Sequence, residues 1–201
     1  MRRKIVPVTP KTLLRSGLEC ASCTRWEGLP TETDPERAHE AKADRMRRLI
    51  RECGACGKMI YVDNEALAYA QYGPARFFPG AQRFSTPVSD DAYLLTCLYV
   101  RSYASGRGLG RVLLQSVEAS LVKRKVKAIE TFATRDEKHA LGPIEFYLQN
   151  GFYIIRDDPK FPLMRLELKA LVGWQINIQF ALDGLKIPVR GHVGAPVSFI
   201  R

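Results

Sequence analysis

Three glycines within five residues follow a long apolar run near the middle of the chain. The run extends from Ala92 to Val100, and the glycines lie in the segment Ser105-Gly106-Arg107-Gly108-Leu109-Gly110. Because glycine permits a tight turn, several backbone N–H groups can point to one place. A helix predicted from about Gly108 to Lys125 adds the positive end of its dipole there. The segment therefore predicts a binding site for a diphosphate.

Two common nucleotide-binding turns fit this pattern poorly. A P-loop ends in Gly-Lys followed by Ser or Thr, and this ending is absent. A Rossmann turn follows the first strand of its domain, and an acidic residue ends the next strand. In this chain at least three predicted strands come before the turn, and the next one, Val126 to Ala133, leads into Thr134-Arg135. The pattern excludes a P-loop and disfavours a dinucleotide site.

Four cysteines in two C-x-x-C pairs form a second candidate site. Cys20 and Cys23 make one pair, and Cys53 and Cys56 make the other. Two such pairs indicate a tetrahedral site for a structural zinc ion. The same residues also fit buried free thiols or a reversible dithiol. Cys97 lies inside the apolar run, where a packed core residue is expected.

The elements around these residues predict an α/β (α+β) chain with a mixed sheet. Strands are expected at Ile5–Val8, Lys58–Val62, Ala66–Tyr72, Ala92–Val100, Val126–Ala133, Phe152–Arg156 and Leu163–Leu168. Helices are expected at Glu36–Glu52, Gly108–Lys125 and Ile144–Asn150, the first of them capped by Asp34-Pro35. The apolar run and strand 126–133 should be parallel, because a helix connects them.

The first helix has an apolar side and a charged side. Met46 and Leu49 share the apolar side, whereas Lys42 and Arg45 fall on the opposite side with other basic residues. We therefore expect Lys42 and Arg45 to face solvent.

The predicted elements divide the chain into a domain, residues 1–170, and a C-terminal extension, residues 171–201. Within the extension, Gln175 to Phe180 alternates between polar and apolar residues, which predicts a strand. Such a strand would extend the chain's own sheet or, in a homodimer, the sheet of a second copy.

Two segments resemble the conserved motifs of the GNAT N-acetyltransferase superfamily. Leu95 to Leu114, where a strand leads through valine to Gly-x-Gly-x-Gly, is similar to motif A. Gly142 to Phe152, where Tyr147 comes four positions before Gly-Phe, is similar to motif B. Both occur in the expected order and spacing, and the resemblance covers roughly residues 1 to 170. It implies the GNAT acyl-CoA N-acyltransferase fold, a mixed central sheet with two splayed parallel strands and flanking helices.

The resemblance also implies where acetyl-CoA would bind. The pantetheine arm would pair with the backbone of Leu98, Tyr99 and Val100 like an added strand. Ser105 stands where the family usually has Arg or Gln, so one phosphate contact is expected to be weaker. The diphosphate would lie on the glycine turn and the start of the helix, at Ser105, Gly106, Arg107, Gly108, Leu109, Gly110 and Arg111.

Tyr147 occupies the family's position for the general acid that protonates the coenzyme A thiolate. Its alternative role is that of a core or interface tyrosine. A backbone N–H near Leu98 would stabilise the tetrahedral oxyanion. No motif assigns the general base, for which Glu130, Asp90, Asp91 or a bound water are candidates. In the GNAT fold the two cysteine pairs would flank adjacent ends of two antiparallel strands, so they could meet at zinc.

The net charge of +10 predicts an electropositive surface that attracts phosphorylated ligands such as coenzyme A. No signal peptide or membrane span is apparent, so we expect a cytoplasmic protein without a membrane partner. The main hypothesis is transfer of acetyl from acetyl-CoA to a primary amine, with strongly cationic amines disfavoured. The alternative is a non-catalytic acyl-CoA sensor or a nucleic-acid-binding module on the same fold. Few aromatic residues accompany the basic segments, which disfavours nucleic acid as a partner.

Overall fold

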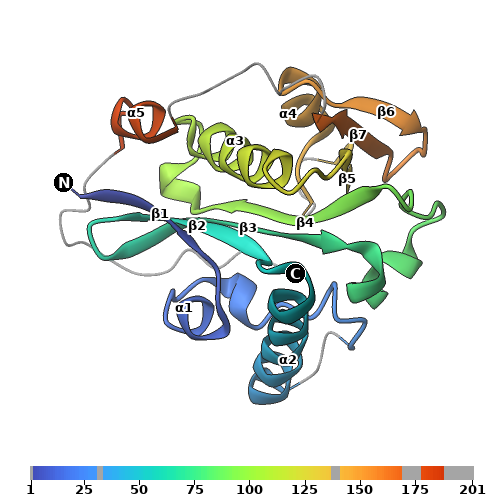
Figure 1. Cartoon of the computed structure of the whole chain (residues 1–201), viewed down its shortest axis with the longest axis horizontal. Coiled ribbons are helices and arrows are strands. Elements are labelled where there is room, and N and C mark those ends of the chain that lie inside the picture. The colour runs from blue at the N-terminus through green and yellow to red at the C-terminus, as the bar shows by residue number, and fades with distance from the viewer. Residues whose placement is uncertain (1, 31–33, 137–140, 169–177, 188–201) are drawn as a thin grey trace.

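The computed structural model describes residues 2–30, 34–136, 141–168 and 178–187. These residues form one sheet of seven strands in the order β1-β2-β3-β4-β5-β7-β6 (Figure 1). The strands are β1 (Arg3–Pro7), β2 (Gly57–Val62), β3 (Glu65–Pro74), β4 (Ala92–Val100), β5 (Ala128–Phe132), β6 (Tyr153–Arg156) and β7 (Leu163–Glu167). Neighbouring strands are antiparallel except for β4 and β5, which are parallel. The predicted mixed sheet and its parallel pair are confirmed.

Helices cover both faces of this sheet. They are α1 (Pro10–Leu14), α2 (Pro35–Cys53), α3 (Leu109–Val122), α4 (Ile144–Gln149) and α5 (Ile178–Asp183). In Figure 1, α1 and α2 lie below the sheet, and α3 and α5 lie above it. Each face has its own hydrophobic core, one built on α3 and the other on α2. None of the helices in the described ranges is long and apolar enough to cross a membrane.

Helix α2 begins and ends at the residues that the sequence indicates. The carboxylate of Asp34 accepts hydrogen bonds from the N–H groups of Glu36 and Arg37, at 2.9 and 3.2 Å. Gly54 ends the helix with a φ of +71°, a conformation that glycine adopts without strain. The assignment of its faces was wrong for two residues, however. Lys42 and Arg45 are buried beside Met46 instead of facing solvent.

The predicted parallel strands separate soon after they pair. The ladder between β4 and β5 runs only from Ala92 opposite Ala128 to Leu94 opposite Glu130. Beyond Leu94, β4 pairs only with β3, while β5 continues beside β7. The two strands therefore form a fork, which the GNAT resemblance had implied.

The predicted strand at Gln175 to Phe180 is wrong in the part that the structure describes, and residues 175–177 lie outside that part. Ile178 to Asp183 form helix α5, which packs against α3 and β1. Ile178, Ala181, Leu182 and Leu185 have the spacing of one helical face, and this face contacts the α3 core. The alternating pattern was too short to decide between a strand and a helix, so packing decided it.

Helix α5 is held in place by both polar and apolar contacts. The Nη1 atom of Arg3 donates to the carbonyl oxygens of Leu182 and Asp183, each at 2.6 Å. The side chain of Leu182 is fully buried, whereas Phe180 is 77% exposed. Residues 178–187 of the C-terminal extension are thus bound to the body of the protein.

We predict that Leu182→Ala lowers the free energy of unfolding by about 2–5 kcal/mol, because it removes a fully buried side chain. Phe180→Ala should change it by no more than about 0.5 kcal/mol, because that side chain is exposed. Urea unfolding of both variants provides the comparison. A larger loss for Phe180→Ala than for Leu182→Ala would show that the segment packs as the alternating strand.

Candidate active site

An extra residue in β4 lies where the fork opens. Gln71 of β3 pairs with Cys97, but the next residue, Tyr72, pairs with Leu95. Thr96 therefore has no opposite residue in β3 and forms a β-bulge, which bends the strand. From Thr96 to Val100, β4 has one edge on β3 and no strand on the other edge among the described residues. Leu98, Tyr99 and Val100, the predicted pantetheine contacts, lie along this open edge and are partly exposed.

The glycine turn has the backbone geometry that the sequence predicts. Gly106 and Gly108 have φ values of +70° and +84°, which a residue with a side chain rarely adopts. Gly108 is the N-cap of α3. The turn from Ser105 to Gly108 is exposed, and Leu109 anchors it by burying its side chain in the α3 core.

The first turn of α3 presents backbone donors without a partner among the described residues. The first N–H bonded inside the helix is that of Val112, which donates to the carbonyl oxygen of Gly108 at 3.1 Å. No side chain caps this end of the helix. The N–H groups of Leu109, Gly110 and Arg111 therefore have no partner within the helix, and the helix dipole adds positive potential there. This arrangement suits a phosphate.

The C-terminal extension lies beside the glycine turn, which the sequence did not reveal. The Nη1 atom of Arg107 donates to the carbonyl oxygen of Lys186 at 3.3 Å. A Cβ atom at Gly108 would lie 2.9 Å from Cδ2 of Leu185. These contacts hold the exposed Arg107 guanidinium next to the turn. The only sequence signal for them is the helical spacing that ends in Leu185.

Tyr147 is buried in α4, close to the fork. It is 2% exposed. Its ring makes edge-to-face contacts with Phe146, at an interplanar angle of 81°, and with Phe152, at 61°. A Cβ atom at Gly142 would lie 2.7 Å from the Tyr147 hydroxyl, so this glycine is needed for the close approach. The hydroxyl also interacts with Thr131, whose Oγ1 donates to the carbonyl oxygen of Leu95 at 2.9 Å.

Burial raises the pKa of Tyr147 to about 12, although the hydrogen bond with Thr131 acts in the opposite direction. The hydroxyl therefore keeps its proton throughout the physiological pH range. A general acid must be protonated before it acts, and Tyr147 meets this requirement. The same burial also fits the structural alternative of a core tyrosine.

Two of the three carboxylates considered as general bases are held in ion pairs. Glu130 is fully buried, accepts from the N–H of Ser89 at 2.8 Å and contacts Nη1 of Arg165 at 2.7 Å. Asp91 binds the same guanidinium through both oxygens, at 2.9 and 3.1 Å, and the pKa of Asp91 is lowered by it. Both groups join β5 to β7 and to the start of β4, so neither is a free base. Asp90 is exposed.

The four cysteines of the predicted zinc site do not come together. All are free thiols, and the described residues contain no group of three His, Cys, Asp or Glu side chains that could hold a metal ion. The ends of β1 and β2 are adjacent as expected, but Cys56 points into the core, with Sγ 3.6 Å from the carbonyl oxygen of Val8. Burial raises the pKa of the Cys20 and Cys56 thiols in the protein without metal. Cys23 and Cys53 are partly buried.

Comparisons with known proteins agree with this geometry. Solved structures with the same fold include the PaiA N-acetyltransferase of Thermoplasma acidophilum in complex with coenzyme A, at 15% identity and a TM-score of 0.57 over 83% of this chain and 99% of that one. A putative GNAT acetyltransferase of Desulfovibrio desulfuricans matches at 22% identity and 0.55, over 83% and 99%. The ribosomal-protein-alanine N-acetyltransferase of Brucella melitensis matches at 20% and 0.54, over 82% and 99%. No curated protein matches significantly.

Residues 21–152 match the acetyltransferase (GNAT) family, and this range contains the fork, the glycine turn, α3 and Tyr147. The parallel pair with its open edge and the first turn of α3 are the parts of the chain where the resemblance predicts that acetyl-CoA binds. The chain belongs to the acetyltransferase (GNAT) family of N-acetyltransferases that use acetyl-CoA.

Proposed function

We propose that the protein transfers acetyl from acetyl-CoA to a primary amine, with the donor bound across the fork and the glycine turn. The single observation that carries this proposal is the open edge of β4 at Leu98 to Val100, next to the exposed turn at the N-terminus of α3. The edge offers backbone groups to the amides of pantetheine. The turn and the N–H groups of Leu109 to Arg111 offer donors to the diphosphate, and the Arg107 and Arg111 side chains add charge.

The reaction begins when a neutral amine attacks the carbonyl carbon of the thioester. A C–N bond forms, and the negative charge on oxygen is stabilised by a backbone N–H near Leu98. The C–S bond then breaks as Tyr147 donates its proton to the departing thiolate. The nitrogen loses one proton to water, and Tyr147 regains one from solvent, so protons balance. The Tyr147 hydroxyl forms a hydrogen bond with Thr131, which in turn donates to the carbonyl oxygen of Leu95 at the base of the fork. The phenol therefore lies beside the fork, which supports this role.

We predict that Tyr147→Phe lowers kcat about 10²-fold or more with little change in the Kd for acetyl-CoA, because only proton transfer is removed. The measurements are steady-state release of coenzyme A and calorimetric binding of acetyl-CoA. Tyr72→Phe is the matched control. Tyr72 is also fully buried, and burial raises its pKa to about 12, yet it faces the far end of α3 near Arg124. Equal turnover in the two variants would contradict the acid role of Tyr147.

We predict that Gly108→Asp lowers kcat/KM for acetyl-CoA at least about tenfold relative to Gly108→Asn, because a carboxylate at the turn repels the diphosphate. The two side chains have nearly the same shape and meet Leu185 alike, so the pair isolates charge. With S-acetylpantetheine, which has no phosphate, the two variants should be equal. If they also differ with that donor, or agree with acetyl-CoA, the diphosphate lies elsewhere.

A further inference from the structure

Three charged side chains meet in the interior between α2 and the sheet. Lys42 and Arg45 of α2 both contact the same oxygen, Oε1 of Glu27, which lies in the loop before α2. The distance from Lys42 Nζ to that oxygen is 3.3 Å. The side chains of Lys42, Arg45 and Glu27 are only 1%, 7% and 3% exposed. Charges of this kind are rarely buried without full pairing.

The charges of this group do not balance. Two cations face one carboxylate, and the neighbouring thiols do not supply the missing negative charge. Burial raises the pKa of Cys97 to about 11, and it raises that of Cys20 further, so both stay neutral near pH 7. A net positive charge in the interior is costly, because the desolvation of an ion is repaid only by a partner of opposite charge.

The same region holds several polar atoms without a hydrogen-bond partner among the described residues. They are Oε2 of Glu27, Nζ of Lys42, Nε and Nη1 of Arg45, the hydroxyl of Tyr69 and the side-chain amide of Gln71. Tyr69 and Gln71 are two positions apart in β3, so they lie on one face of the strand. Tyr69 belongs to the α2 core, which places both on the face that α2 covers. We call Glu27, Lys42, Arg45, Tyr69 and Gln71 the buried polar cluster.

Two members of the cluster, Tyr69 and Gln71, lie beside the part of β4 where the thioester is proposed to bind. Gln71 pairs with Cys97 at the β-bulge, and Tyr69 pairs with Tyr99, so these two residues flank the position opposite Leu98. Cys97 and Tyr99 also pack against the α2 core. A ligand held by the cluster would thus approach the fork from the α2 side of the sheet, whereas α3 and the glycine turn lie on the other side.

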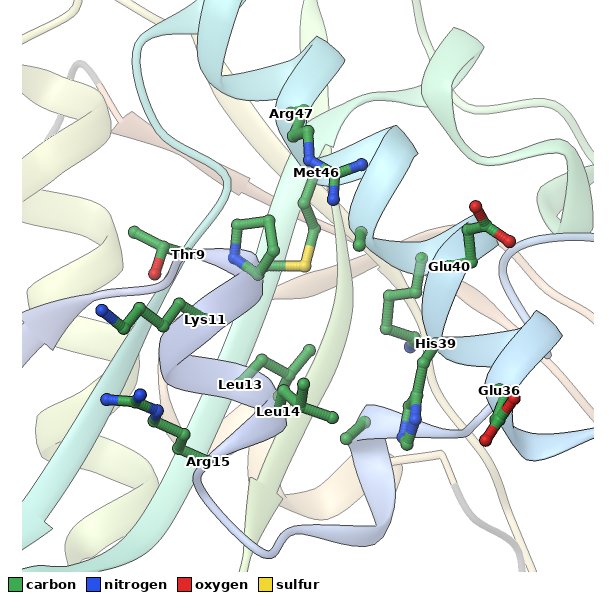
Figure 2. A pocket seen from close by; sticks show the side chains of 14 residues that line it. Thr9, Lys11, Leu13, Leu14, Arg15, Glu36, His39, Glu40, Met46 and Arg47 are labelled. Atoms are coloured by element: carbon green, nitrogen blue, oxygen red, sulfur yellow. The ribbon is translucent and has the colours of Figure 1, made fainter.

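A groove of about 870 Å³ between α1 and α2 reaches the cluster at Lys42. Its walls include Lys42 together with the apolar side chains of Leu13, Ala21 and Met46. Figure 2 shows Leu13 and Leu14 of α1 between two charged rims, with Lys11 and Arg15 on one side and Glu36 and Glu40 on the other. This volume suits a small organic molecule.

We propose that the buried polar cluster binds a carboxylate of the acceptor, so that the acceptor is a small molecule carrying both a primary amine and a carboxylate. The carboxylate supplies the second negative charge that Lys42 and Arg45 need beside Glu27, and it accepts from Nζ of Lys42 and from Nε or Nη1 of Arg45. The Tyr69 hydroxyl and the Gln71 amide, on the face of β3 that α2 covers, offer further donors. The proposal rests on the acetyl transfer proposed above, because it names the acceptor of that same site.

The test compares amine–carboxylate compounds with their carboxamides, for example 4-aminobutyrate with 4-aminobutanamide and alanine with alaninamide. For the pair that wild type accepts best, kcat/KM should favour the carboxylate. This preference should fall about 10- to 100-fold in Lys42→Met and in Arg45→Gln, the range expected for a charge-assisted hydrogen bond. Arg48→Gln, on the exposed side of the same helix, is the control for charge and should keep the preference.

Stability separates a ligand site from a purely structural ion group. Lys42→Met leaves Arg45 and Glu27 as a balanced pair, so its melting temperature should equal or exceed that of wild type. Glu27→Gln leaves two unpaired cations and should melt lower. If Lys42→Met melts as low as Glu27→Gln and keeps the carboxylate preference, the cluster is structural and the proposal is wrong.

Calorimetric binding of the same compounds, without acetyl-CoA, distinguishes the two proposals. Carboxylate binding to wild type that is lost in Lys42→Met, without turnover of any amine, would overturn the proposed function and support the cluster as a carboxylate site. Turnover of amines with no preference for the carboxylate would support the proposed function and overturn the cluster's role. Wild type that neither binds nor prefers carboxylates contradicts the inference outright.

Discussion

The central constraint on this structure is the short pairing between β4 and β5, which ends after Leu94 opposite Glu130. Two neighbouring parallel strands would normally continue their ladder, and their buried backbone groups would be satisfied by it. Here the bulge at Thr96 bends β4 toward β3, and β5 stays with β7. A side-chain hydrogen bond from Thr131 to the carbonyl oxygen of Leu95 closes the base of the fork. The edge left open beyond it is where the pantetheine arm is proposed to pair.

The two faces of the sheet carry the two proposed halves of the site. On the α3 face, the glycine turn and the first N–H groups of α3, which have no partner within the helix, can donate hydrogen bonds to an anionic group. Two residues of the C-terminal extension lie beside this turn. Leu185 lies close to Gly108, and the carbonyl oxygen of Lys186 accepts a hydrogen bond from Arg107. On the α2 face, Glu27, Lys42 and Arg45 provide buried charge beneath the same stretch of β4. In the proposed reaction, the donor approaches from the α3 face and the acceptor from the α2 face, and the two meet at the fork.

The sequence predicts elements whose signals are local. The cap at Asp34, the apolar run of β4 and the helical spacing of α3 each act within a few residues, and the structure confirms them. The glycine turn was also predictable, because only glycine tolerates the φ values at Gly106 and Gly108. Tyr147 could be located from its motif, but its burial depends on Gly142 and on residues of β5.

The rest depends on contacts between distant segments. The bulge at Thr96 arises from the register between β3 and β4, which no local pattern encodes. Lys42 and Arg45 look like solvent-facing cations until Glu27, a residue of the preceding loop, is placed against them. The spacing of the cysteines suggested zinc, but spacing does not set the direction of a side chain, and Cys56 turns into the core. The short alternation before α5 was ambiguous for the same reason, since packing on α3 decides it.

Hydrogen–deuterium exchange with and without coenzyme A tests the central claim most directly, because it reads the backbone amides that the fork and the turn leave free. Coenzyme A should slow exchange at Leu98 and Val100, whose N–H groups face the open edge, and at Gly106 to Arg111, with little change on the edge strand β1. Protection at one of the two segments alone would mean that only half of the donor site is correctly placed. Unchanged exchange at both, under conditions where calorimetry shows coenzyme A bound, would contradict the account.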